Sequence, residues 1–448
     1  MSNIKQLIFP NGFRVVYEKS KNILPITSIF VFCDLGSVYE KEDTRGASHF
    51  IEHMCFKGTK RILESSDIFK EFDKSGSEYN ASTYKRYTYY NLKCDNENIE
   101  QYLFFISDMI LNSTFKRKEY DKELKVVIEE NIRDTDNLEI LLEEKTDKMI
   151  YNGSSFENPV DSIDYHNKND LKYEKVIEIY KLFYQPNNIV LSIVSNISFS
   201  TIKKYIKKTF FYKKNSENIE LLKNNKLVLY IPPNIQNNIC YSIKKINNSN
   251  ATYLSISFRT CNQYSKDRFL LNLLKDMLGG LLSSRLFKIL REDNGLTYKS
   301  DVSTQNNEVI GDFTITAITD PSKLINNGKH NLGVLPLIIK LLNDLIKNGI
   351  QENELLLVKK FIKGRINLRM ENNDTNAIYN GEQIILYPNN ESLIPYENTF
   401  ETYYKNITKS QVFEVIKKYF IKSNMNVCII GEQNPSENII SRECEKLL

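Results

Sequence analysis

The same helix–turn–strand pattern ends both halves of the chain. In the first half, the segment KVIEIYKLFYQPNNIVLSIVSN is typical of a helix, an Asn-containing turn and a short apolar strand. The segment ITKSQVFEVIKKYFIKSNMNVCIIGE repeats this order close to the C-terminus. An internal repeat indicates that one structural plan is used twice. We therefore expect an α+β fold made of two domains of similar plan in tandem.

A polar stretch separates the two halves. Residues 213–226, KKNSENIELLKNNK, are rich in Lys and Asn and are the best candidate for a linker. We therefore expect a first domain over residues 1–212 and a second domain over residues 227–448. The total of 448 residues is enough for two domains that each bury a core of their own.

Composition excludes several classes of protein. The net charge of +4 is small for this length and is not the basic balance of nucleic-acid or anionic-membrane binders. No apolar run approaches the ~20 residues of a membrane-spanning helix. The seven cysteines are an odd number without a CxxC pair, which suits a reducing compartment. The first residues have no signal or transit character. We expect a cytoplasmic protein, with a virion or an organelle left open.

The segment HFIEH carries the clearest chemical signal. His49, Glu52 and His53 stand at positions i, i+3 and i+4 and share one face of a helix. Two imidazoles one turn apart can bind one zinc ion, and a neighbouring carboxylate can then deprotonate water on the metal. H-x-x-E-H is the mirrored zincin motif. The alternative is a pair of solvated His side chains, and a third protein ligand is needed to decide between them.

A later predicted helix, KELKVVIEENIRDT, offers carboxylates for the third position. Glu130 and Glu123 are two turns apart and share a face of that helix. Glu129 is adjacent to Glu130 but points about 100° away around the helix axis. The residues alone leave open which of these carboxylates is the third ligand.

HFIEHMCFKGT, followed by this pair of glutamates, resembles the pitrilysin/insulinase (M16) family of zinc peptidases. In size and layout the chain is most similar to the two-domain members that are like the mitochondrial processing peptidase. The resemblance implies one zinc ion per chain, held by His49, His53 and Glu130. It also implies that Glu52 is the general base and that Glu123 is a further catalytic residue.

Two further stretches extend the resemblance. GSEYNASTYKRYTYYNLKC is similar to the family's strand after the active helix, which implies that Asn80 and Ala81 lie along an edge that binds substrate. SSRLFKILREDNGLTYKSDV resembles a family signature in the second domain. It implies that Arg291 and Tyr298 are catalytic and donate to the charge on the reacting oxygen. Asp161 stands where the family usually has Gly, which affects the expected shape of that loop and not the metal site.

The resemblance implies a zinc-dependent metalloendopeptidase that cleaves peptides or unfolded segments. The alternative is a non-catalytic structural or partner subunit of the same family. It further implies two α/β-sandwich domains, each a mixed, mostly antiparallel sheet with helices packed on it. Family members close a chamber from four such domains, so this chain is expected to form a homodimer, or a heterodimer with a related subunit. Whether the Arg/Tyr pair acts in cis or in trans is open. No nucleic-acid or membrane partner is expected.

Overall fold

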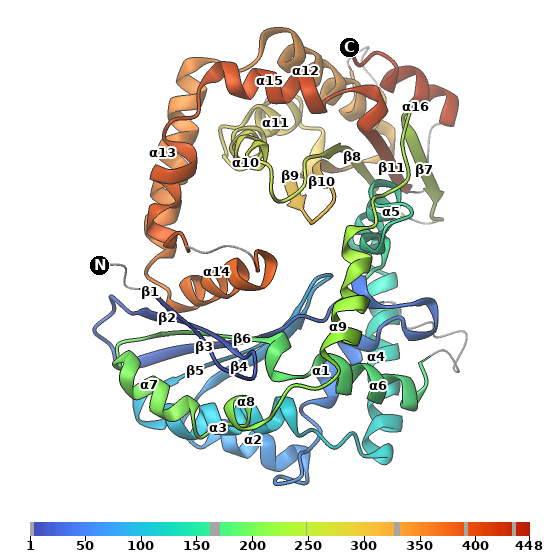
Figure 1. The fold of residues 1–448 in the computed structure, drawn as a ribbon. Helices are drawn as coiled ribbons and strands as arrows, with labels where there is room; N and C mark the ends of the chain where they lie inside the picture. The colour runs from blue at the N-terminus through green and yellow to red at the C-terminus, as the bar shows by residue number, and fades with distance from the viewer. Residues whose placement is uncertain (1–3, 162–170, 248, 327–331, 389–392, 432–435) are drawn as a thin grey trace. The chain divides into compact units, whose positions relative to one another are not determined.

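The computed structural model describes residues 4–161, 171–247, 249–326, 332–388, 393–431 and 436–448 (Figure 1). The chain forms two compact units, and each contains one β-sheet. Unit 1 comprises Met1–Arg133, Asn158–Val228 and Ile366–Asn398, and unit 2 comprises Asp134–Glu157, Leu229–Arg365 and Thr399–Leu448.

The sheet of unit 1 has six strands in the order β1-β2-β6-β3-β5-β4. These strands are β1 (Ile4–Ile8), β2 (Arg14–Lys19), β3 (Ile26–Cys33), β4 (Glu78–Thr83), β5 (Thr88–Asp95) and β6 (Ile189–Ser195). Strands β2 and β6 are parallel, and the other neighbours are antiparallel. Strand β4 therefore forms one edge of the sheet, with strand β5 as its neighbour.

The sheet of unit 2 repeats this plan with five strands in the order β7-β11-β8-β10-β9. They are β7 (Cys240–Lys245), β8 (Thr252–Thr260), β9 (Thr297–Asn306), β10 (Gly311–Thr319) and β11 (Met425–Gly431). Strands β7 and β11 are parallel, as β2 and β6 are, and the remaining pairs are antiparallel. The predicted α+β fold with two similar, mostly antiparallel sheets is confirmed.

Helices cover both sheets. Unit 1 contains α1 (Ala47–Met54), α2 (Ser65–Asp73), α3 (Ile99–Leu111), most of α4 (Arg117–Thr135), α6 (Tyr173–Phe183), α7 (Phe199–Ile206), α8 (Phe210–Lys213), α9 (Ile219–Asn225) and α14 (Asn373–Leu386). Unit 2 contains α5 (Leu138–Ile150), α10 (Asp267–Leu278), α11 (Arg285–Phe287), α12 (Val334–Asn348), most of α13 (Glu352–Arg369), α15 (Lys409–Tyr419) and α16 (Glu437–Cys444). No helix among the described residues has both the length and the apolar character needed to span a bilayer.

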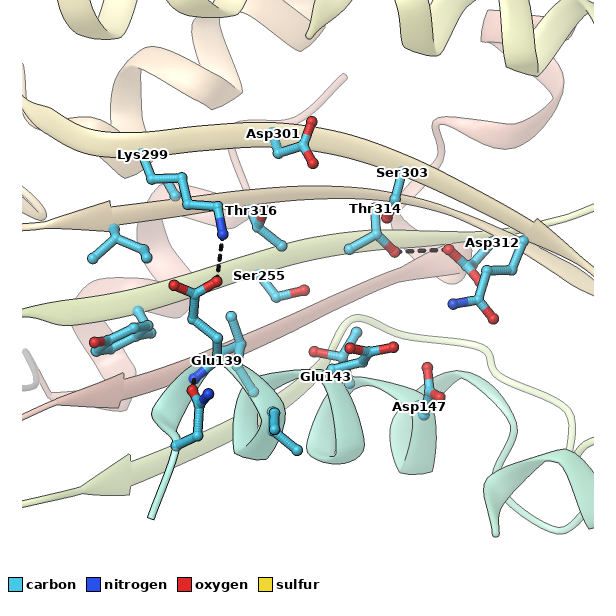
Figure 2. A pocket seen from close by; sticks show the side chains of 18 residues that line it. Glu139, Glu143, Asp147, Ser255, Lys299, Asp301, Ser303, Asp312, Thr314 and Thr316 are labelled. Carbon is cyan, nitrogen blue, oxygen red and sulfur yellow. Dashed lines mark hydrogen bonds and ion pairs between the residues drawn. The ribbon is translucent and has the colours of Figure 1, made fainter. Parts of the chain in front are cut away.

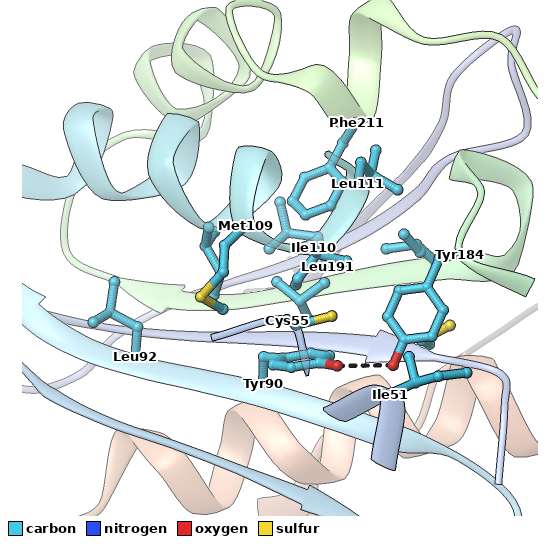
Figure 3. Close-up of a cluster of buried hydrophobic side chains, with 14 of the residues drawn as sticks. Ile51, Cys55, Tyr90, Leu92, Met109, Ile110, Leu111, Tyr184, Leu191 and Phe211 are labelled. Carbon is cyan, nitrogen blue, oxygen red and sulfur yellow. Dashed lines mark hydrogen bonds between the residues drawn. The ribbon is translucent and has the colours of Figure 1, made fainter. Parts of the chain in front are cut away.

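The main core of unit 1 lies between its sheet and helices that include α1, α3 and α6. Strand β3, ITSIFVFC, is buried over seven of its eight residues, because both faces of the sheet are covered and the strand is apolar on both. Figure 3 shows part of this core, with Ile51 and Cys55 packed near Tyr90 of β5. The Tyr90 and Tyr184 hydroxyl oxygens lie 2.8 Å apart, so these buried polar atoms are satisfied.

Each unit takes one helix from the other half of the chain. Helix α14 packs on the opposite face of the first sheet, where Ala377 and Ile385 contact the cluster around Phe32. Helix α5 packs on the second sheet through Leu142, beside Cys428. The predicted division into residues 1–212 and 227–448 does not include this exchange, because an apolar helix face does not specify which of two apolar sheets it covers.

The segment expected to be a linker, residues 213–226, contains helix α9. Its Leu222 is 4% exposed and belongs to the main core of unit 1, whereas the neighbouring Leu221 is exposed. The boundary between the two units falls after Val228. Leu222 and polar contacts such as the hydrogen bond from the Ser216 hydroxyl to the Asn11 carbonyl oxygen attach this segment to the first unit.

Candidate metal centre

Helix α1 has one apolar face and one face that carries the two imidazoles. Phe50, Ile51 and Met54 are fully buried in the core, so the side chains of His49 and His53 lie on the opposite, partly exposed face. The residue before the helix is Gly46 with φ +79°, a left-handed conformation that favours glycine. This packing determines which way the two imidazoles point.

The structure brings His49, His53 and Glu130 together. The two Nε2 atoms lie 3.1 Å apart, and the Nε2 atom of His53 lies 3.5 Å from Oε2 of Glu130 on helix α4. One ligand atom from each residue lies within 4.8 Å of the others. Across the described part of the chain, this is the one group of His, Cys, Asp or Glu that converges in this way. These are the three ligands expected from the sequence, whereas Glu129 is exposed.

Glu52 lies beside this group and is 8% exposed. Its Oε2 atom accepts a hydrogen bond of 2.6 Å from the Thr83 hydroxyl on β4. Burial raises the pKa of Glu52, while the Thr83 hydrogen bond and the nearby imidazoles oppose the shift. A cation bound at the His49–His53–Glu130 group adds to this opposing effect, because positive charge favours the carboxylate.

Glu123 lies behind His53 and not among the converging ligand atoms. Its Oε1 atom lies 2.9 Å from Nδ1 of His53, and its Oε2 atom lies 2.6 Å from the Lys57 ammonium. Burial acts to raise the pKa of Glu123, but the hydrogen bonds from His53 and Lys57 outweigh it and lower the pKa. Glu123 therefore contacts one imidazole and one lysine, and its role as a further catalytic residue stays a prediction.

Other side chains of unit 1 complete the surroundings. Both oxygens of the buried Glu40 carboxylate accept backbone N–H groups at the start of α1, from Gly46 and Ser48, at 2.7 Å each. Burial raises the pKa of Glu40 to about 7 against the effect of these hydrogen bonds. The Oδ1 atom of Asp161 lies 2.7 Å from Nδ1 of His49. Sequence reasoning did not assign Glu40, Lys57 or Thr83, because their partners are distant along the chain or are backbone groups.

Asn80 and Ala81 lie on the edge strand β4, as expected. Ala81 pairs with Tyr90 of β5, and the Asn80 side chain accepts a hydrogen bond from the Ala81 N–H at 2.9 Å. Thr83, two residues further along the strand, contacts Glu52. The edge strand therefore passes next to Glu52 of helix α1.

Arg291 and Tyr298 belong to unit 2. The Arg291 guanidinium donates hydrogen bonds to the carbonyl oxygens of Thr297 and Tyr298, at 2.7 and 3.1 Å. The Tyr298 side chain, at the start of β9, is 65% exposed. The structure thus brings these two residues to each other, and their role at the metal group stays a prediction.

Unit 2 also contains a polar cavity of about 430 Å³ between α5 and strands β8, β9 and β10 (Figure 2). Two of its carboxylates have clear partners within the unit. Glu139 forms an ion pair with Lys299, and Asp312 accepts hydrogen bonds from Tyr151 and Thr314. This cavity holds no converging set of metal ligands among the described residues, so the candidate site is the group in unit 1.

Comparisons with known proteins indicate the family of the chain. Residues 14–161 match the model of the insulinase family (peptidase family M16), and residues 170–361 match the model described as the peptidase M16 inactive domain. An uncharacterized zinc protease of Bacillus subtilis is 28% identical over 394 residues, which cover 87% of this chain and 90% of that protein. The mitochondrial-processing peptidase subunit beta of Caenorhabditis elegans is 31% identical over 205 residues, or 45% of this chain and 43% of that protein.

Solved structures share the whole fold. A protease from Helicobacter pylori superposes with a TM-score of 0.86 at 20% identity, covering 96% of this chain and all of that chain. A peptidase M16 inactive domain from Pseudomonas fluorescens gives a TM-score of 0.82 at 16% identity, covering 97% of this chain and all of that chain. With both of the family's domain models matched in order along the chain, the protein belongs to the insulinase family, peptidase family M16.

Proposed function

We propose that the protein is a zinc-dependent endopeptidase that hydrolyses peptide bonds in peptides or unfolded segments. The observation that carries the proposal is the convergence of His49, His53 and Glu130 beside the buried carboxylate of Glu52. Three ligands with a fourth position for water are the usual set of a catalytic zinc site.

Two of the three donor separations fit zinc. Ligand atoms on a tetrahedral zinc ion, with bonds of about 2.0–2.1 Å, lie roughly 3.3 Å apart. The observed separations of 3.1 Å between the two imidazole nitrogens and 3.5 Å between His53 and Glu130 lie on either side of this value. Bound zinc supplies Lewis acidity toward a water molecule and a peptide carbonyl.

Glu52 moves the proton in the proposed reaction. It accepts a proton from the attacking water while the water oxygen bonds to the peptide carbon, and it then donates that proton to the amine as the C–N bond breaks. Thr83 donates to Oε2 of Glu52, which holds the carboxylate in one orientation and leaves Oε1 for the proton. Arg291 and Tyr298 are proposed to donate to the oxygen that becomes negative.

The edge strand β4 is proposed to bind the substrate. An extended peptide can add to a sheet edge through main-chain hydrogen bonds, which tolerate many sequences. Asn80 and Ala81 lie on this edge, and Thr83 of the same strand contacts Glu52. A peptide paired with β4 would therefore run past the proposed base.

The alternative function is a non-catalytic partner subunit. Residues 170–361 match a domain described as inactive, and the only H-x-x-E-H segment of the chain lies in the first half. The presence of Glu52 beside three zinc-type ligands favours the enzyme, because a purely structural metal site has no need of a base. We also propose that two chains pair, as a homodimer or with a related subunit, which a mass measurement in solution tests.

The test is a zinc assay combined with a peptide-cleavage assay. Wild-type protein should bind one zinc ion per chain and cleave a quenched peptide, and a chelator should abolish cleavage until zinc is restored. Glu52→Gln should keep the zinc and lose about 10²–10⁴-fold in turnover. Normal cleavage by Glu52→Gln would reject the mechanism. Stoichiometric zinc without cleavage in the wild type would favour the non-catalytic alternative.

A further inference from the structure

We propose that Asp161 is a positioning residue that orients the metal ligand His49, an inference that rests on the proposed zinc site. The Asp161 Oδ1 atom lies 2.7 Å from Nδ1 of His49. Both atoms are buried, and within the described residues neither forms a hydrogen bond to any other group. The two atoms are therefore available to share one hydrogen bond with each other.

The two imidazoles have matching surroundings. The Nε2 atoms of His49 and His53 face each other at 3.1 Å, and each Nδ1 atom faces a carboxylate, from Asp161 or from Glu123. A metal-binding His usually donates its second ring N–H to a carboxylate or carbonyl, which fixes the tautomer and the ring orientation. With the proton on Nδ1, the Nε2 lone pair points toward Glu130 and the proposed metal position.

The loop that carries Asp161 is attached to the segment before α1. The Asn158 side chain donates to the carbonyl oxygens of Ser37 and Glu40, at 3.3 and 3.2 Å. The Ser37 hydroxyl donates to the carbonyl oxygen of Asn158 at 3.1 Å. Because the Glu40 carboxylate accepts the first N–H groups of α1, one anchor holds both the helix of His49 and the loop of Asp161.

The two carboxylates differ in their other contacts. The Glu123 side chain is 7% exposed and also pairs with Lys57, so its replacement disturbs two partners. The Asp161 side chain is 34% exposed and lies at the position where the family resemblance leads one to expect Gly. Asp161 can therefore be replaced with less effect on the fold, and the second carboxylate is a feature of this chain that the resemblance does not imply.

The test measures zinc affinity by competition with a chelator in the full chain. Asp161→Ala should weaken zinc binding about 10- to 100-fold, the usual scale for the loss of such a partner. Asp161→Asn, which keeps an acceptor oxygen but loses the charge, should lie between Asp161→Ala and the wild type. The matched control is Asp121→Asn, on the exposed surface of α4 in the same unit, and its zinc affinity should equal that of the wild type.

Two further measurements separate positioning from folding. The unfolding midpoint of the zinc-free protein should be the same in Asp161→Asn and the wild type. The visible spectrum of the Co²⁺-substituted protein should change, because it reports the arrangement of the ligands. Zinc affinity within twofold of the wild type in both Asp161 variants, with an unchanged Co²⁺ spectrum, would overturn the inference. A wild-type protein that binds no stoichiometric zinc would instead reject the proposed function.

Discussion

The Thr83 hydroxyl donates a hydrogen bond of 2.6 Å to Glu52, and so connects the edge strand β4 to the helix α1. The two residues lie on elements that are separated in sequence by α2. The contact places the proposed base next to the strand proposed to bind substrate. It also provides a way to test the base without replacing it.

Thr83→Val should lower kcat/KM for a model peptide by about 10- to 100-fold. Valine keeps the shape of threonine but removes the donor, and a hydrogen bond to a charged group contributes about 1.5–3 kcal/mol. Thr83→Ser keeps the hydroxyl and should remain within about threefold of the wild type. Equal losses in the Ser and Val variants would show that the methyl group, and not the hydrogen bond, matters.

Glu130→Gln should abolish stoichiometric zinc binding, whereas Glu129→Gln should not change it. The two residues are neighbours on α4, but only Glu130 faces the imidazoles. Removing a ligand's charge weakens a three-ligand zinc site because the metal then lacks its one anionic partner. Elemental analysis after dialysis measures the zinc content of both variants. Loss of zinc in Glu129→Gln alone would show that the ligand is assigned to the wrong glutamate.

Glu123→Gln should weaken zinc binding by about 10- to 100-fold and leave a measurable site. The change removes the charged partner of the His53 Nδ1 atom but none of the three ligands. Chelator competition measures the dissociation constant. If zinc binding were lost completely, as expected for Glu130→Gln, Glu123 would be a ligand itself and not a residue that orients His53.

The zinc-free protein should become less stable as the pH rises from about 4.5 to 7, because the buried Glu40 carboxyl ionises over this range. The pKa of this carboxyl is raised by burial to about 7 in the folded protein, from an ordinary value of 4.5. The folded state therefore keeps its proton after the unfolded state has lost it. The stabilisation that this proton gives the folded state is fully present below pH 4.5 and is lost as the pH rises through 7.

Urea unfolding at several pH values measures this effect. Glu40→Gln should flatten the decline between pH 4.5 and 7, because glutamine cannot ionise. The opposite outcome is a free energy of unfolding that rises over this range in the wild type and stays level in the Gln variant. It would show that the hydrogen bonds from Gly46 and Ser48 lower the pKa of Glu40 by more than burial raises it.

Leu222→Ala should destabilise the protein by about 2–4 kcal/mol, and Leu221→Ala should change the free energy of unfolding by less than about 0.5 kcal/mol. Leu222 of α9 is buried in the main core of unit 1, whereas Leu221 is 54% exposed. A large-to-small change in a core removes buried area and leaves a cavity, while an exposed change does neither. If Leu222→Ala changed the free energy of unfolding as little as Leu221→Ala, residues 213–226 would act as a linker.

The sequence by itself identified the candidate ligands and the general fold. The spacing of His49, Glu52 and His53 follows from helix geometry, and the apolar residues between them require that the other face of α1 be buried. The repeated helix–turn–strand pattern predicted two similar α+β units, because local periodicity is enough to specify elements of this kind. These features depend on neighbours along the chain.

Tertiary structure decided what surrounds the ligands and which sheet each helix covers. Thr83, Lys57 and Asp161 reach the site from a strand, a turn and a loop, and no local pattern distinguishes them from ordinary surface residues. The exchange of α5 and α14 between the two halves depends on which apolar faces meet. Burial of apolar surface is non-directional, so only the packed chain shows which partner each helix face has found.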